Sequence, residues 1–378
     1  MSDLRLFGDL RKAAFISRPN RFIIECLLDG MTVRAYLPNP GRLWELLFPG
    51  TGLYLSRNSS TEGSTDYTCV GVEREGRPIL LHTHHTNTVA RWLIDEGRIP
   101  SLAGYRVERA EVTCGHSRFD LLLKKSNEEL LLEVKSCTLF GRETAMFPDA
   151  VTARGRKHIL ELAELSRKGR KGGVLFVVHS PTAQRFMPEY HTDIEFSNAL
   201  CDVKDEILVR AVGVNWRHDL TPEPQARELE IPWSLIEREA HDSGSYIILL
   251  RLKEEKEISV GALGRLRFPK GYYLYVGSAM ENLTARISRH QRMRKNQHWP
   301  IDYLRHEAEF IAGLPVRASE RLECAIAGSL KEIAEWSVQG FGSSDCDCDS
   351  HLFGMGTNPI GSPAFIGMLQ HFRMDRLT

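Results

Sequence analysis

Hydrophobic residues in the first 82 positions occur in short runs that turn residues interrupt. Ile23-Ile-Glu-Cys-Leu-Leu28 and Met31-Thr-Val-Arg-Ala-Tyr36 are separated by Asp29-Gly30, and further runs are bounded by glycine and proline. Short apolar runs between turn residues are typical of β-strands joined by tight turns. We therefore predict a small OB-like barrel over residues 1–82.

The next stretch mixes helical and strand patterns. Thr88 to Gly97 has the apolar spacing of a helix, and two apolar strands follow at Arg118–Leu123 and Glu129–Ser136. A helix carrying basic residues is expected from Thr152 to Leu165, and Gly173–Val178 reads as a buried strand. A series of strand, helix and strand predicts an α/β domain, which we place at residues 83–236.

The chain then turns polar and proline-bearing at Thr221-Pro-Glu-Pro-Gln225, which is expected to be flexible. A second unit begins near Ser243, and we predict an α+β domain over residues 237–355 with a loosely held tail over 356–378. Its expected elements are the strands Gly244–Leu250 and Gly271–Ala279, separated by a Gly-rich loop, and the helices Asn282–Arg294 and Ser319–Ile326.

Composition supports a multidomain globular protein, because 378 residues exceed what one hydrophobic core usually organises. The net charge is zero, so any nucleic-acid surface must come from local basic clusters, and each cluster could equally be a solvated helix face. Most of the eight cysteines are scattered singly, as in reduced proteins. No signal peptide or membrane-spanning run is apparent, so we expect a cytoplasmic protein with no membrane partner.

Two opposite charges, Glu133 and Lys135, interrupt an apolar strand and project from the same side, because strand side chains alternate faces. If the hairpin turn closes on residues 126–127, Asp120 falls opposite Glu133. Two such carboxylates can share a hard cation, Mg²⁺ or Mn²⁺, and an adjacent ammonium suits a reaction that builds charge on phosphate. The alternative is a charged pair that caps an edge strand.

This pattern resembles the PD-(D/E)XK nuclease fold, in which the Asp and Glu hold magnesium and the Lys orients water or stabilises the transition state. The flanking motifs Arg18–Phe22, Leu37–Leu43 and Phe147–Thr152 resemble the sugar fermentation stimulation protein A (SfsA) family in the same order along the chain. That resemblance implies an OB-like barrel, a PD-(D/E)XK-type domain and DNA binding, with RNA not excluded. The candidate nucleic-acid contacts in this half are Arg21, Asn39, Arg42, Arg118, Arg154, Lys157 and His158.

The second unit resembles a GIY-YIG nuclease domain from about residue 244 to residue 353. Gly244-Ser-Tyr246 and Tyr275-Val-Gly277 take the places of the two triplets, although the first has Ser instead of Ile and the two lie far apart. The resemblance implies that Glu323 binds a divalent ion and that Arg286 stabilises the charged transition state. It also implies that Tyr246 or Tyr275 assists deprotonation of the attacking water and that His290 participates. Arg289, between Arg286 and His290 on the expected helix, is a candidate nucleic-acid contact.

The segment Cys346-x-Cys348-x-x-His351 supplies three of the four ligands of a tetrahedral zinc site, and Cys324 is a candidate fourth. Its spacing is not that of a standard zinc finger, and aspartates alternate with the thiols. A solvated acidic loop is therefore the alternative to zinc.

Two functions fit these residues. The first is a metal-dependent endonuclease with two candidate centres that hydrolyse phosphodiester bonds in DNA. The second is a non-catalytic DNA-binding regulator, in sugar metabolism, that uses nuclease folds as binding surfaces. Retention of Asp120, Glu133 and Lys135 together favours catalysis, because a pure binder would gain from replacing acidic groups that face phosphate.

Overall fold

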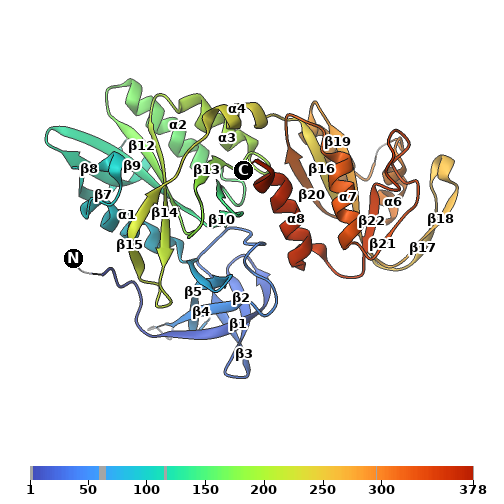
Figure 1. The fold of residues 1–378 in the computed structure, drawn as a ribbon, viewed down its shortest axis with the longest axis horizontal. Helices are drawn as coiled ribbons and strands as arrows, with labels where there is room; N and C mark the ends of the chain where they lie inside the picture. The colour runs from blue at the N-terminus through green and yellow to red at the C-terminus, as the bar shows by residue number, and fades with distance from the viewer. Residues whose placement is uncertain (1–2, 59–64, 115–116, 295, 378) are drawn as a thin grey trace. The chain divides into compact units, whose positions relative to one another are not determined.

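A computed structural model describes residues 3–58, 65–114, 117–294 and 296–377 of the chain (Figure 1). The chain divides into two compact units. The first holds almost all residues up to Trp233, and the second holds Tyr190–Ile194 and Ser234–Arg376. Within the described residues, no helix is both long and apolar enough to span a bilayer.

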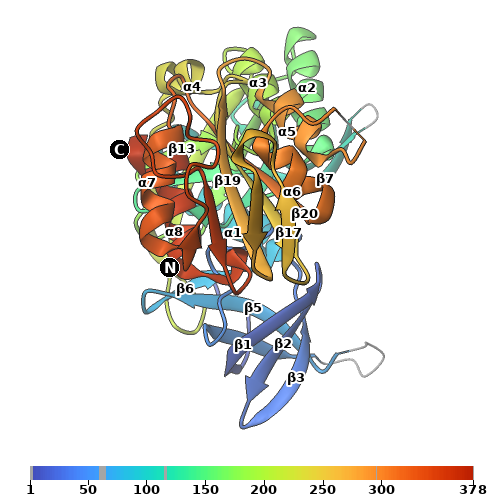
Figure 2. The ribbon, with the colours of Figure 1, turned by 90° about the vertical axis from the view of Figure 1, so that its right-hand side faces the viewer.

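The first unit begins with a six-stranded sheet in the order β3-β2-β1-β4-β5-β6, whose strands are seen in an orthogonal view in Figure 2. An additional parallel pairing of β3 with β5 joins distant strands of this sheet, as barrel closure requires. Asp29 and Gly30 both have positive φ, which the tight turn between β2 and β3 demands. The predicted OB-like barrel is confirmed. Its strands are β1 Leu10–Asn20, β2 Ile23–Leu28, β3 Met31–Tyr36, β4 Gly52–Arg57, β5 Tyr67–Arg74 and β6 Arg77–Leu80.

An α/β layer follows, built on a sheet in the order β15-β14-β12-β9-β8-β7. Strand β12 is parallel to both of its neighbours and entirely buried, and β7, β8 and β9 form an antiparallel meander. The strands are β7 Arg106–Cys114, β8 Ser117–Lys125, β9 Glu128–Cys137, β12 Gly172–Val178, β14 Leu208–Trp216 and β15 Pro222–Glu228. The helices are α1 Thr86–Asp95, α2 Ala153–Arg167 and α3 Ile194–Val203, and a small sheet contains β10 Leu139–Phe140, β11 Thr144–Phe147 and β13 Arg185–Pro188.

The expectation that Thr221-Pro-Glu-Pro-Gln225 is flexible was wrong. Most of this segment lies in strand β15, which pairs with β14 through Val214 and Ala226. Strand β15 is at the edge of the sheet, where a proline without an N–H group does not interrupt a ladder.

The second unit contains an antiparallel sheet in the order β20-β16-β19-β22-β21. Helix α5 packs on β16 and β20, and α7 packs on β19 and α8. Its strands are β16 Gly244–Leu252, β19 Gly271–Ala279, β20 Glu309–Arg317, β21 Trp336–Ser337 and β22 Leu352–Met355. Its helices are α5 Leu283–Gln291, α6 Pro300–Glu307, α7 Glu323–Ile333 and α8 Pro363–Arg373, and α4 Trp233–Glu239 precedes the sheet.

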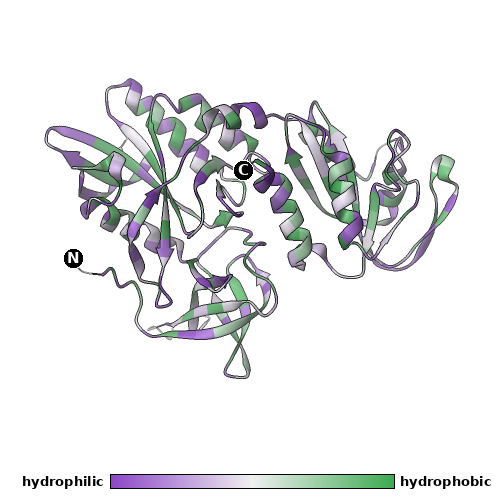
Figure 3. Ribbon diagram, viewed as in Figure 1, coloured by the Kyte–Doolittle hydropathy of each residue, from purple (hydrophilic) through white to green (hydrophobic). Residues whose placement is uncertain are grey.

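Two expectations for this unit fail. The segment between β16 and β19 is not a plain loop, because it forms a hairpin of β17 Lys256–Ser259 and β18 Arg265–Phe268. The segment after Gly356 is not loosely held either. It contains α8, which carries both apolar and polar residues (Figure 3) and whose apolar side chains Phe365 and Phe372 are buried.

Candidate functional site

The β8–β9 hairpin brings the first group of candidate residues together. Its turn closes on Ser126 and Asn127, with Ser126 at positive φ, and the strands pair with Leu121 opposite Leu132. One step further along this register, Asp120 stands beside Glu133, and its Oδ2 accepts a hydrogen bond from the Val134 N–H at 2.8 Å. The predicted hairpin closure is confirmed.

Glu133 is buried, with 4% of its side chain exposed, and one of its carboxylate oxygens contacts two basic side chains. Lys135 Nζ lies 2.6 Å from Oε1, and His158 Nδ1 lies 2.5 Å from the same oxygen. Burial alone would raise the pKa of Glu133, but the bond to His158 and the charge of Lys135 outweigh it and lower the pKa. Oε2 is also buried, and among the described residues it has no hydrogen-bond partner.

Asp120 is held from two sides, because its Oδ1 accepts a hydrogen bond from Asn87 Nδ2 at 2.8 Å. Burial raises the pKa of Asp120, and the negative charge of Glu133 raises it further. The two negative carboxylates repel each other, and one buried carboxylate oxygen has no partner among the described residues. A hard divalent cation, which prefers oxygen ligands, would be stabilised at this position.

A cavity of about 430 Å³ opens over these carboxylates. Barrel residues form one wall, and residues of β8, β9 and the segment before α2 form the other. The cavity therefore combines an acidic pair with cationic and amide groups. Its lining includes Arg21, Asn39, Asn87, Asp120, Glu133, Lys135 and Arg154.

The other expected nucleic-acid contacts of this unit have partners within the protein. Arg42 Nε donates to the Asp149 carbonyl at 2.6 Å, and Arg118 forms an ion pair with Glu111. His158 was expected to contact nucleic acid, but it is buried and contacts Glu133 instead of facing solvent.

Lys157, the neighbour of His158, is an exposed residue whose Nζ lies 3.5 Å from Glu161 Oε1. Its ion pair lies within α2, between residues one turn apart. The two adjacent residues therefore differ in environment although the sequence placed both on a phosphate-binding surface.

Sequence reasoning missed two residues that shape this site. Asn87, on α1, fixes Asp120, and Asp149 accepts the Leu43 N–H at 2.7 Å as well as the Arg42 bond. A Cβ on Gly41 would lie 2.7 Å from Asp149 Oδ2, so a larger residue there would displace this carboxylate. Asp149 lies in the motif Phe147–Thr152, but its contacts with Arg42 and Leu43, like that of Asn87 with Asp120, join residues far apart along the chain.

The second group of candidates gathers on β16, β19 and α5. Tyr246 OH lies 2.9 Å from His290 Nε2, and the Tyr275 ring packs edge-on against the same imidazole. A Cβ on Gly277, opposite Tyr246, would lie 2.4 Å from the hydroxyl. Burial raises the pKa of Tyr246, although the positive charge of Arg286 opposes this shift.

Glu323, the first residue of α7, lies close to these tyrosines and is 17% exposed. Ser278 Oγ donates to its Oε2, and His351 Nδ1 lies 3.0 Å from its Oε1. Burial would raise the pKa of Glu323, but these two partners outweigh it and lower the pKa.

The two arginines of α5, Arg286 and Arg289, have different partners. The Arg286 guanidinium lies 4.5 Å from the Trp299 ring and interacts with Tyr246. Arg289 Nη2 lies 3.0 Å from Oδ2 of the fully buried Asp302, so its position is explained by this ion pair instead of by a free phosphate-binding surface.

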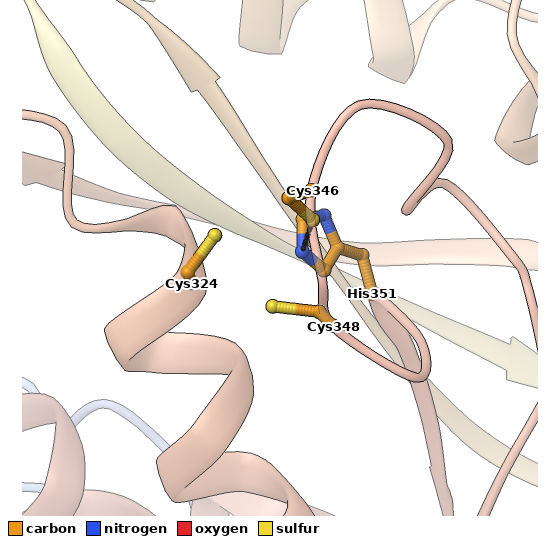
Figure 4. A group of neighbouring side chains, drawn as sticks. All are labelled: Cys324, Cys346, Cys348 and His351. Atoms are coloured by element: carbon orange, nitrogen blue, oxygen red, sulfur yellow. Dashed lines mark hydrogen bonds between the residues drawn. The ribbon is translucent and has the colours of Figure 1, made fainter.

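The cysteine and histidine residues singled out in the sequence also come together. Donor atoms of Cys324, Cys346, Cys348 and His351 all lie within 4.8 Å of one another (Figure 4). Cys324 comes from α7, and the other three come from the loop before β22.

Comparison with known proteins assigns most of the chain to described domain families. Residues 16–81 match the SfsA N-terminal OB domain, and residues 84–219 match the sugar fermentation stimulation protein RE domain. Residues 245–373 match a domain of unknown function, DUF123.

Individual relatives agree with the first two matches. A sugar fermentation stimulation protein homolog from Methanothermobacter thermautotrophicus is 35% identical over 224 residues, which cover 54% of this chain and 93% of that protein. A homolog from Methanosphaera stadtmanae is 40% identical over 200 residues, or 52% of this chain and 83% of the relative. The structure of Pyrococcus furiosus SfsA in complex with Ca²⁺ is similar with a TM-score of 0.56 at 29% identity, covering 61% of this chain and 99% of that one. The chain therefore belongs to the sugar fermentation stimulation protein family and carries an additional C-terminal domain.

Proposed function

We propose that this protein is a metal-dependent nuclease that hydrolyses phosphodiester bonds in DNA through a PD-(D/E)XK-type centre at Asp120, Glu133 and Lys135. One observation carries the proposal. Glu133 Oε2 is buried beside Asp120 and has no hydrogen-bond partner among the described residues, although an unpaired buried carboxylate oxygen is costly. A divalent cation at this position would satisfy it.

Asp120 and Glu133 would hold Mg²⁺ or Mn²⁺, which when bound neutralises charge on the phosphate and lowers the pKa of water. The similar Pyrococcus furiosus protein was solved with Ca²⁺, another hard cation that takes oxygen ligands. The donor set here, two carboxylates in an oxygen-rich cavity, has the same chemical preference.

The residues around the carboxylates have separate tasks. His158 holds the Glu133 oxygen that faces away from the proposed cation, and Asn87 holds Asp120. Lys135 presents its ammonium at the cavity, where negative charge develops during hydrolysis. Arg21 and Arg154 also line the cavity and would bind flanking phosphates without reading sequence.

We also propose a second centre of GIY-YIG type in the C-terminal unit. Its support is the convergence of Tyr246, His290 and Arg286 in the neighbourhood of Glu323. Both Glu323 oxygens already have a neighbour, Ser278 Oγ or His351 Nδ1, but a carboxylate oxygen has more than one lone pair, and the side chain stays partly exposed.

A cleavage assay tests both centres on the full chain. Plasmid, branched and single-stranded DNA, and RNA as a comparison, are incubated with Mg²⁺ or Mn²⁺. Asp120→Asn should reduce cleavage by about 100-fold or more, because the cation loses a charged ligand. The matched control Glu111→Gln, on the neighbouring strand, should leave the rate unchanged.

Glu323→Gln and the double variant Asp120→Asn/Glu323→Gln show how the cleavage activity is distributed between the two proposed centres. A residual rate in Asp120→Asn that disappears in the double variant, while the thermal midpoint of the double variant stays that of the parent, would support the second centre. Cleavage that survives both substitutions would reject these site assignments. DNA binding without cleavage under every metal would support the non-catalytic regulator instead.

A further inference from the structure

We propose that Cys324, Cys346, Cys348 and His351 form a structural zinc site in the C-terminal unit. Their donor atoms lie within 4.8 Å of one another, and Figure 4 shows the Cys324 and Cys348 thiols pointing toward each other beside the imidazole. Zn–S bonds of about 2.3 Å in a tetrahedron separate the donor atoms by roughly 3.8 Å. Shifts of about 1 Å or less would therefore complete the site.

The histidine is oriented as a zinc ligand would be. Its Nε2 lies 3.4 Å from Cys346 Sγ, and its Nδ1 lies 3.0 Å from Glu323 Oε1. Zinc-bound histidines usually direct the second ring nitrogen to a carboxylate, which fixes the tautomer and the ring orientation. Glu323 therefore acts as the positioning residue for His351, and Nε2 is left for the metal.

The local structure favours metal binding over a solvated acidic loop. Cys346 and Cys348 are partly buried, whereas Asp345 and Asp347 are exposed, so the thiols turn inward and the carboxylates turn outward. Cys324 lies in the first turn of α7, so the fourth ligand comes from a separate element. Three thiols and one imidazole match the soft, tetrahedral preference of zinc.

The proposed zinc would stabilise the loop that packs against Tyr275. The His351 carbonyl accepts the Val276 N–H at 2.9 Å, next to Tyr275 on β19. Gly342, at positive φ in the same loop, packs so close to Tyr275 that a Cβ would lie 3.0 Å from the ring. Four protein ligands leave no open coordination position, so the role of the ion is structural.

Metal analysis of the full chain tests the proposal. Protein made in zinc-supplemented medium and purified under reducing conditions should contain one zinc per chain by mass spectrometry of the metal. Cys348→Ser should lose this zinc, and its neighbour Asp347→Ser should retain it. Glu323→Gln should retain the site with an affinity about 10–100-fold weaker in competition with a chromogenic chelator.

Three results would overturn the proposal: folded parent protein without zinc, full zinc occupancy in Cys348→Ser, or a disulfide among the three thiols. If Cys348→Ser does not fold, cobalt replacement in the parent decides the question. Tetrahedral cobalt–thiolate absorption is expected, and its absence would contradict the site. None of these measurements depends on DNA cleavage, so the proposal stands or fails separately from the nuclease.

Discussion

At the residue scale, the candidate nuclease centre depends on how one buried carboxylate is held. Glu133 directs Oε1 to Lys135 and His158 and leaves Oε2 unsatisfied beside Asp120. His158 and Lys157 are adjacent in sequence, and their charge pattern made both look like phosphate contacts. Only the three-dimensional structure separates a positioning residue from an exposed one.

This difference gives a prediction for neighbouring substitutions. His158→Ala should weaken Mg²⁺ affinity and cleavage by about 10–100-fold, because Glu133 loses the partner that orients it. Lys157→Ala should change cleavage much less and should act through DNA affinity at low salt. The measurements are cleavage rates titrated with Mg²⁺ and DNA affinity by fluorescence anisotropy. A larger metal-affinity loss in Lys157→Ala would refute the positioning role.

At the element scale, the sequence predicted the strands and turns that local residue patterns determine. The alternation in β8 and β9, with a two-residue turn at Ser126 and Asn127, fixed the register that places Asp120 beside Glu133. Contacts between distant segments were not predictable in the same way. Asn87, which binds Asp120, comes from another element. Helix α8 was not predicted because proline and glycine residues near it indicated a loop.

The end of α4 is tied to the C-terminal segment by a buried ion pair, and this contact predicts a pH effect. Arg376 Nη2 lies 2.7 Å from Glu239 Oε2. Burial would raise the pKa of Glu239, but the bonds from Arg376, Arg238 and Ser319 outweigh it and lower the pKa to about 2. A carboxylate with a lowered pKa stabilises the fold above its unfolded pKa near 4.3, and this contribution is lost as the pH falls toward 2.

Glu239→Gln should therefore destabilise the C-terminal unit by about 1–3 kcal/mol near neutral pH, and the difference from the parent should shrink below about pH 4. Urea unfolding at several pH values measures this. Glu320→Gln is the matched control, because Glu320 pairs with the same arginine at 3.3 Å but is exposed. Its loss should stay within about 1 kcal/mol. An equal loss in both variants would contradict the role of burial.

At the scale of the whole molecule, the metal sites proposed for the two compact units have opposite chemical preferences. The first offers carboxylate oxygens, which suit hard cations, and the second offers thiolates and an imidazole, which suit zinc. A hard cation at an acidic pair serves a reaction, whereas a closed thiolate site contributes folding energy directly. Removing both metals should therefore have two separable consequences.

Treatment of the full chain with a strong chelator should abolish cleavage and also lower the thermal midpoint of the C-terminal unit. Mg²⁺ alone should restore cleavage at the first centre, and zinc alone should restore the thermal midpoint, because each site selects by ligand type. Cys348→Ser should show the lowered midpoint without a chelator, whereas Asp120→Asn should keep the parent midpoint. Calorimetry combined with the cleavage assay checks this. If Mg²⁺ restored the midpoint, or if Asp120→Asn lowered it as Cys348→Ser does, the separation of the two metal roles would be wrong.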